Sequence, residues 1–158
     1  MIELKTLYEQ DVTAWALQNL ELLKAGRFAE LDIANLEEEL ADMGSSERNE
    51  LENRLTILLA HLLKWQYQYK LLSERWQEFK GDSWRSTLIE QRNRIQKRLQ
   101  RNPSLKSKLD HIIQEAYKDA VKLAAKETRL PTATFPKICP YPWKQIIDDD
   151  FYPQSIEI

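Results

Sequence analysis

The sequence predicts an all-α protein: a single domain, residues 1–158, in which about five helices form a bundle around one long central helix. Three observations support this prediction. Glycine occurs only three times, while 42% of the residues are hydrophobic and 30% are charged, a composition that favours helices over the turns of an all-β protein. Apolar residues recur at helical spacing over residues 51–76. Five of the six prolines follow residue 130, which sets residues 131–158 apart from a helical bundle of residues 1–130.

The first predicted helix begins near Thr6 and ends before Gly26. Thr6 and Glu9 have the spacing of a capping box, in which each side chain bonds to a free backbone amide. The apolar residues of this helix are expected to point mainly inward: Val12, Trp15, Leu20 and Leu23.

A second helix is predicted to begin after Asp32 as its N-cap and to bury an apolar stripe formed by Ile33, Leu36, Leu40 and Met43. Gly44, Ser45 and Ser46 combine a C-terminal glycine with a new N-cap, so a break or kink is expected there. A continuous helix remains an alternative, because one glycine costs only about 1 kcal/mol relative to alanine.

The third helix has the most regular pattern. Its apolar residues alternate spacings of four and three without a miss: Leu51, Leu55, Leu58, Leu62, Trp65, Tyr69, Leu72 and Trp76. Such a heptad seam is typical of a helix that packs along its whole length. Ile57, Leu59 and Leu63 widen the apolar face near the middle, which favours the central helix of a bundle over a lone coiled-coil strand.

Two further helices and a C-terminal segment follow. Residues 80–83 predict a turn, with Asp82 or Ser83 capping a fourth helix. That helix has a thin apolar stripe: Trp84, Leu88, Ile95 and Leu99. Pro103 suits the first position of a fifth helix, in which Ala116, Ala120 and Ala124 permit a close helix contact. The prolines and aromatic rings after residue 130 predict an extended segment packed on the bundle, with one short helix from Pro142.

The predictions about cellular location and cofactors follow from sequence features that the chain lacks. Cys139 is the only cysteine, so an intrachain disulfide and a cysteine-pair zinc site are excluded, and a buried, inert thiol is expected. Because the sequence starts without a basic and apolar leader and has no apolar run long enough to cross a bilayer, a cytoplasmic protein without a membrane partner is expected. No glycine-rich phosphate loop exists, and His111 with Glu115 is a weak metal pair, so no cofactor is expected.

Charge is segregated along the chain. Residues 28–52 contain nine acidic residues and one basic residue, whereas residues 85–108 contain eight basic residues and one acidic residue. The two segments either complement each other within the fold, or the second presents a basic helix to a nucleic-acid backbone or an acidic protein. The candidate basic patch consists of Arg92, Arg94, Lys97, Arg98 and Arg101.

A candidate polar cluster lies close to the predicted core. It consists of Glu37, His61, Lys64, Arg85 and Arg92. If the second and third helices are neighbours, Glu37 approaches His61 or Lys64, since a buried glutamate needs a cation. The cluster could be a buried network that fixes helix register, a catalytic acid–base pair or part of a ligand pocket.

Short motifs along the chain resemble one known family. They are residues 35–39 (NLEEE), 43–48 (MGSSER), 61–65 (HLLKW), 83–85 (SWR), 134–136 (TFP), 139–141 (CPY) and 150–153 (DFYP). The chain resembles domain-of-unknown-function family twenty-nine, an almost entirely helical group that is abundant in cyanobacteria. The resemblance implies a helical fold and a bacterial source, and it brings no activity, cofactor or catalytic residue.

The leading functional prediction is a non-enzymatic protein-interaction or adaptor module that binds an unknown protein or associates with itself. It rests on the missing catalytic motifs, the heptad seam and the segregated charge. The first alternative is a nucleic-acid-binding or regulatory protein that uses the basic face of residues 85–108. The second alternative is an enzyme that uses Glu37, His61 and Lys64.

Overall fold

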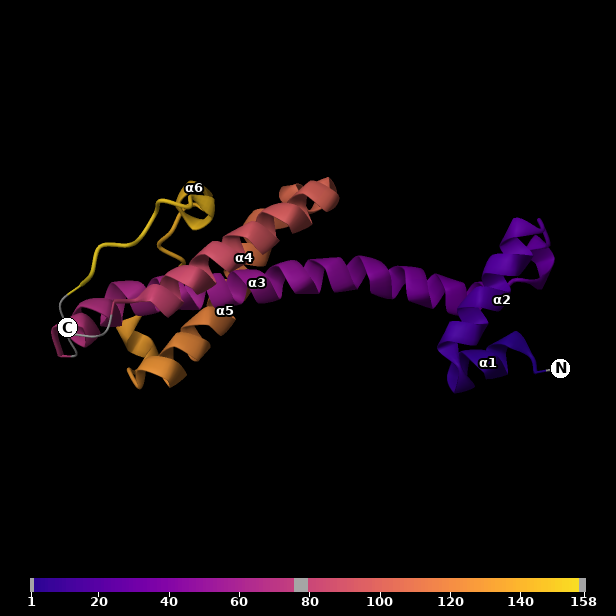
Figure 1. Cartoon of the computed structure of the whole chain (residues 1–158), viewed down its shortest axis with the longest axis horizontal. Helices are drawn as coiled ribbons and strands as arrows, with labels where there is room; N and C mark the ends of the chain where they lie inside the picture. The colour runs from indigo at the N-terminus through magenta and orange to yellow at the C-terminus, as the bar shows by residue number, and fades with distance from the viewer. Residues whose placement is uncertain (1, 76–79, 157–158) are drawn as a thin grey trace. The chain divides into compact units, whose positions relative to one another are not determined.

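The computed structural model describes residues 2–75 and 80–156, and within these ranges the chain contains helices and no strand. Figure 1 shows the six α-helices: α1 (Leu4–Gln10), α2 (Val12–Lys24), α3 (Ile33–Arg75), α4 (Asp82–Arg101), α5 (Leu109–Thr128) and α6 (Trp143–Ile147). Short 3-10 helices form at η1 (Phe28–Glu30), η2 (Pro103–Lys108) and η3 (Thr132–Thr134). The all-α prediction is therefore confirmed.

The chain forms two compact units, residues 1–46 and residues 47–158. Helix α3 contributes its first turns to the N-terminal unit and the rest of its length to the C-terminal unit. The assignment of the whole chain to a single domain stays a prediction.

The break expected at Gly44 does not occur. Gly44 lies inside α3, and no atom comes within 4 Å of the place where a Cβ would stand. The surrounding residues are mainly good helix formers, which offset the cost of about 1 kcal/mol for one exposed glycine. The predicted second and third helices are therefore one helix.

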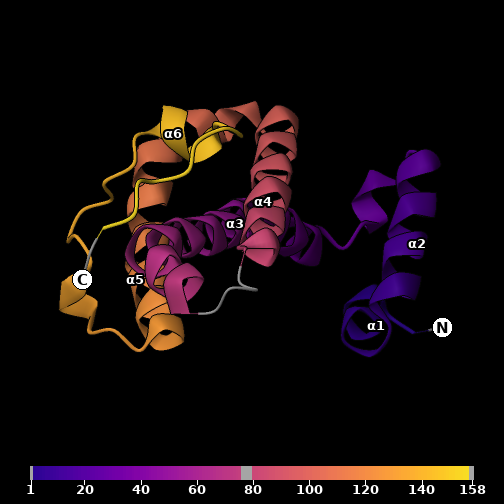
Figure 2. The ribbon, with the colours of Figure 1, turned by 60° about the vertical axis from the view of Figure 1, so that its left-hand side comes forward.

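The core of the C-terminal unit forms around the heptad seam, as predicted. Leu51, Leu55, Leu58 and Leu62 of α3 are fully buried, and Trp65 is 5% exposed. Tyr69 and Leu72 are half-buried, and Trp76 lies outside the described residues. Figure 2 shows α4 and α5 flanking this part of α3. Their contributions to the core include Leu88, Ile95 and Leu99 from α4, and Ile112, Ala116, Ala120 and Ala124 from α5.

The C-terminal segment packs on this core and contains the expected short helix after Pro142, α6. Phe135, Tyr141 and Ile146 are buried in the core cluster. The Tyr141 hydroxyl donates to the Gln66 Oε1 at 2.6 Å, and the Ile156 amide donates to the Gln66 carbonyl at 2.7 Å. These contacts tie the segment to α3.

The turn before α4 uses a glycine instead of a capping side chain. Gly81 has φ 70°, and neither Asp82 nor Ser83 provides a side-chain cap. A Cβ on Gly81 would stand 2.5 Å from the Tyr69 Cε2, so both the backbone and the packing favour glycine there. Pro103 begins η2 rather than α5, which starts at Leu109.

The N-terminal unit has a small interior. Trp15 is 3% exposed, and its Nε1 donates to the Asp32 Oδ2 at 3.0 Å. The predicted capping box of Thr6 and Glu9 is wrong, because α1 already begins at Leu4. The chain instead breaks at Asp11, whose carboxylate accepts the Ala14 amide at 3.0 Å and caps α2.

The predicted inward stripes of this unit are mostly wrong. Leu36 is half-buried, but the other apolar residues apart from Trp15 are exposed: Val12, Leu20, Leu23, Ile33, Leu40 and Met43. The periodicity correctly groups these residues on helix faces. The unit, however, is too small to cover them.

Candidate functional site

The predicted pairing of Glu37 with His61 or Lys64 is wrong. It required two neighbouring helices, but all three residues belong to α3. Side chains of one helix meet when they are three or four residues apart, which Glu37 and His61 are not. Glu37 is exposed in the N-terminal unit, whereas the other four residues of the candidate polar cluster belong to the C-terminal unit.

Lys64 instead pairs with Glu127 of α5. Its Nζ lies 2.5 Å from the Glu127 Oε2 and 4.9 Å from the centre of the Trp84 ring. The Lys64 side chain is 8% exposed and the Glu127 side chain 38%, so the pair joins α3 to α5 at the edge of the core. Sequence reasoning missed Glu127, because no local pattern relates residues 63 positions apart.

His61 is half-buried beside this pair. Its Nδ1 lies 2.9 Å from the Ile57 carbonyl oxygen, which suits a neutral ring that carries its proton on Nδ1. Burial lowers the pKa of His61 below its ordinary value, and the nearby Lys64 ammonium acts in the same direction. The hydrogen bond to Ile57 and the Glu127 carboxylate oppose this shift.

The lowered pKa predicts that His61 makes the protein less stable in acid. The unfolded chain binds the proton more readily, so the free energy of unfolding should fall as the pH drops through the ordinary value of 6.5 and below. Thermal unfolding should be measured at about pH 7.5 and about pH 5.5. The stability lost between these two pH values should be smaller for His61→Gln than for the parent. His111→Gln is the matched control at an exposed position. An equal or larger acid loss in His61→Gln would contradict the assignment.

Arg85 and Arg92 make structural contacts. The exposed Arg85 guanidinium lies 5.1 Å from the Trp65 ring centre and 5.2 Å from the Tyr152 ring centre. Arg92 is fully buried and donates to three backbone carbonyls of the C-terminal segment: Gln145, Ile146 and Phe151. The contacts of the candidate polar cluster thus favour packing roles over an acid–base site.

Three of the five residues of the candidate basic patch are ion-paired or buried. Arg92 is buried, and Arg94 lies 2.7 Å from Glu90. Arg98 lies 2.9 Å from Glu47 and 3.8 Å from Glu50, and this pairing lowers the pKa of Glu47. Within the described residues, Lys97 and Arg101 are the exposed members of the patch without an ion pair. Both line a hollow of about 220 Å³.

The exposed apolar surface is concentrated in the N-terminal unit. Among the described residues, nine of the thirteen exposed large hydrophobic side chains belong to it: Ile2, Val12, Leu17, Leu20, Leu23, Phe28, Ile33, Leu40 and Met43. Helix α2 carries apolar residues around its whole circumference, yet it buries only Trp15 and Asn19. A helix that is apolar on all sides is ordinarily covered on all sides.

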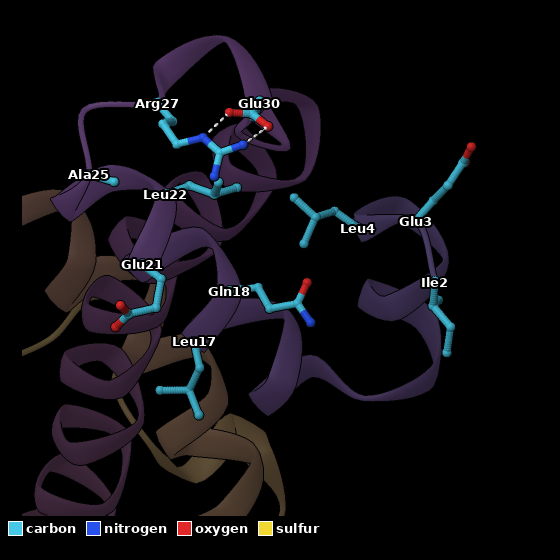
Figure 3. A pocket seen from close by; sticks show the side chains of 10 residues that line it. All are labelled: Ile2, Glu3, Leu4, Leu17, Gln18, Glu21, Leu22, Ala25, Arg27 and Glu30. Carbon is cyan, nitrogen blue, oxygen red and sulfur yellow. Dashed lines mark hydrogen bonds and ion pairs between the residues drawn. The ribbon is translucent and has the colours of Figure 1, made fainter.

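Two of the hollows formed by the described residues lie on this unit. The larger, the N-terminal groove, has a volume of about 910 Å³ and lies between the start of the chain and α2 (Figure 3). Its lining consists of Ile2, Glu3, Leu4, Leu17, Gln18, Glu21, Leu22, Ala25, Arg27 and Glu30. The smaller, of about 230 Å³, has Asn19 as its one polar lining residue and includes Leu20, Leu23 and Leu36.

The N-terminal unit is also acidic. Residues 1–46 contain ten Asp or Glu and three Lys or Arg. One of the carboxylates, Glu39, accepts a hydrogen bond from the Tyr8 hydroxyl at 2.5 Å, which raises the pKa of Tyr8 to about 12. The unit therefore combines exposed apolar side chains with a net negative charge.

Within residues 2–75 and 80–156, no three or more His, Cys, Asp or Glu side chains gather as a metal site would require. No described helix has the length and hydrophobicity needed to cross a membrane.

The family model for the domain of unknown function DUF29 matches residues 7–152. The chain belongs to the DUF29 family. The match covers all six helices except the first turn of α1, so it includes the core and seven of the ten residues that line the N-terminal groove. No curated protein and no solved structure matches this DUF29 chain significantly.

Proposed function

We propose that this DUF29 protein is a protein-interaction module that binds a partner protein through its N-terminal unit. The supporting observation is that, among the described residues, nine of the thirteen exposed large apolar side chains lie in residues 1–46. Water contact of so many leucine-sized groups is unfavourable, and large exposed apolar patches are typical of binding sites.

The charge of the unit favours a protein over the other classes of partner. An excess of seven negative charges repels the phosphates of nucleic acids and the anionic lipids of a membrane surface. It also disfavours pairing with the same surface of a second copy, since like charges would face each other. A different protein with an apolar surface and basic groups satisfies both requirements.

Site-specific crosslinking tests this proposal in the native cell. A photo-crosslinking amino acid would replace Leu17, which is 57% exposed, and in a control chain Ile138, which is 79% exposed in the C-terminal unit. A specific adduct with another protein is expected from position 17 and not from position 138. No adduct at position 17, the same adducts at both positions, or only an adduct between two copies of the chain would contradict the proposal.

A further inference from the structure

We infer that the N-terminal groove binds an amphipathic helix of the partner protein whose apolar face is flanked by lysine or arginine. This inference rests on the proposed function and specifies the chemistry of the partner. It follows from the floor of the groove, its rim and the backbone around it.

The floor of the groove is apolar and of suitable size. Leu4 of α1 points toward α2, where Leu17 and Leu22 line the opposite side (Figure 3). A volume of about 910 Å³ accommodates several large side chains. An amphipathic helix presents such a set, because residues at spacings of three, four and seven lie on one face.

The rim of the groove is acidic. Among the described residues that line the groove, the carboxylates belong to Glu3, Glu21 and Glu30, and the one cation is Arg27. Glu30 neutralises Arg27 through a two-point ion pair, in which the Arg27 Nη2 lies 2.5 Å from the Glu30 Oε1. Lys24 lies 3.9 Å from Glu21, but both side chains are exposed and such pairs contribute little. The rim therefore retains an excess of negative charge that basic flanking residues would complement.

The surrounding backbone favours a helical occupant over an extended one. The groove is formed by helices α1 and α2, whose interior amides and carbonyls already bond within each helix. An extended peptide would find no sheet edge to pair with, whereas a helix satisfies its own backbone.

A second copy of this chain does not supply such a helix. Its most basic described helix, α4, turns its apolar face into the core, where Leu88, Ile95 and Leu99 are at most 5% exposed. That helix would have to leave the C-terminal unit in order to enter the groove. The occupant is therefore assigned to a different protein.

Binding of synthetic peptides to the full chain tests the inference. The probe is a fluorescent helical peptide of about 18 residues built from leucine and lysine, and its counterpart replaces every lysine with glutamate. The lysine peptide should bind at least about tenfold more tightly and gain helical circular dichroism when bound. Its affinity should fall as salt rises from about 50 to about 500 mM.

Matched variants separate the groove from general charge attraction. Leu17→Ser and the double variant Glu3→Lys/Glu21→Lys should each weaken binding of the lysine peptide by about tenfold. Glu9→Lys changes an exposed carboxylate of the same unit outside the groove, and it should change the affinity by less than about twofold. Unchanged circular dichroism of each variant controls for folding.

The inference would be overturned if the two peptides bound equally, or if Leu17→Ser left the affinity for the lysine peptide unchanged. It would also be overturned if Glu9→Lys weakened that affinity, per charge changed, as much as Glu3→Lys/Glu21→Lys does. These outcomes are distinguishable from failure of the proposed function. If position 17 still crosslinks to a protein in the cell while the lysine peptide fails these tests, the interaction stands and the helical, basic occupant is wrong.

Discussion

Replacing Leu58 with alanine is expected to lower the free energy of unfolding by about 2–5 kcal/mol. Leu58 is fully buried in the heptad seam of α3, where α3, α4 and α5 form one core cluster. The substitution removes apolar contacts and leaves a cavity that rigid neighbouring helices fill only in part. Urea unfolding followed by circular dichroism measures the change.

Leu40→Ala is the matched control, because it makes the same chemical change in the same helix. Leu40 is 68% exposed, so the expected loss is below about 0.5 kcal/mol. This contrast also tests the exposed apolar surface on which the proposed function rests. If Leu40→Ala cost as much as Leu58→Ala in the isolated protein, Leu40 would be covered in solution and that surface would not be free for a partner.

Replacing Arg92 with methionine is expected to lower the free energy of unfolding by about 3 kcal/mol. The Arg92 Nε donates to the Ile146 carbonyl at 2.9 Å, and its Nη2 donates to the Phe151 carbonyl at 2.9 Å and to the Gln145 carbonyl at 3.3 Å. Methionine fills similar space but leaves these buried acceptors without a donor. Part of the loss is offset, because the variant no longer buries a charge.

Two controls isolate the role of Arg92 in holding the C-terminal segment. Arg94→Met alters a neighbouring arginine whose side chain is 50% exposed, and it should cost less than about 0.5 kcal/mol. Arg92→Lys keeps the charge but loses the planar, forked donor group, so it should remain destabilised. Faster hydrogen exchange of residues 145–156 in Arg92→Met is expected. Parent-like stability and exchange would show that the three carbonyl contacts do not hold this segment.

The helical content and the central seam could be predicted from the sequence because both depend on local patterns. Leu51, Leu55 and Leu58 recur at spacings that place them on one face of a helix, and hydrophobicity makes that face a core. The short helix after Pro142 followed from proline chemistry in the same way. A single glycine was a weaker signal, and the break expected at Gly44 was wrong because its neighbours sustain the helix.

The candidate sites could not be predicted to the same degree. Lys64 finds its carboxylate in Glu127, and Arg92 finds its acceptors in the backbone of α6 and at Phe151 after it. These contacts join residues more than 50 positions apart. The sequence predicted that Glu37 would border the core and need a cation, but Glu37 is exposed, and the buried charges of the candidate polar cluster are those of Lys64 and Arg92. Which partners they meet depends on how the helices pack.

By itself, the sequence determined that the chain is helical, which residues share each helix face, and that residues 51–72 provide an apolar seam. Only the tertiary structure decided which faces are covered. Leu36 and Leu40 follow the same periodicity as Leu51 and Leu58, but only the latter pair is enclosed by α4 and α5. The reason is physical: periodicity orients side chains about a helix axis, whereas burial requires a second surface in contact with them, and residues 1–46 do not provide enough of one.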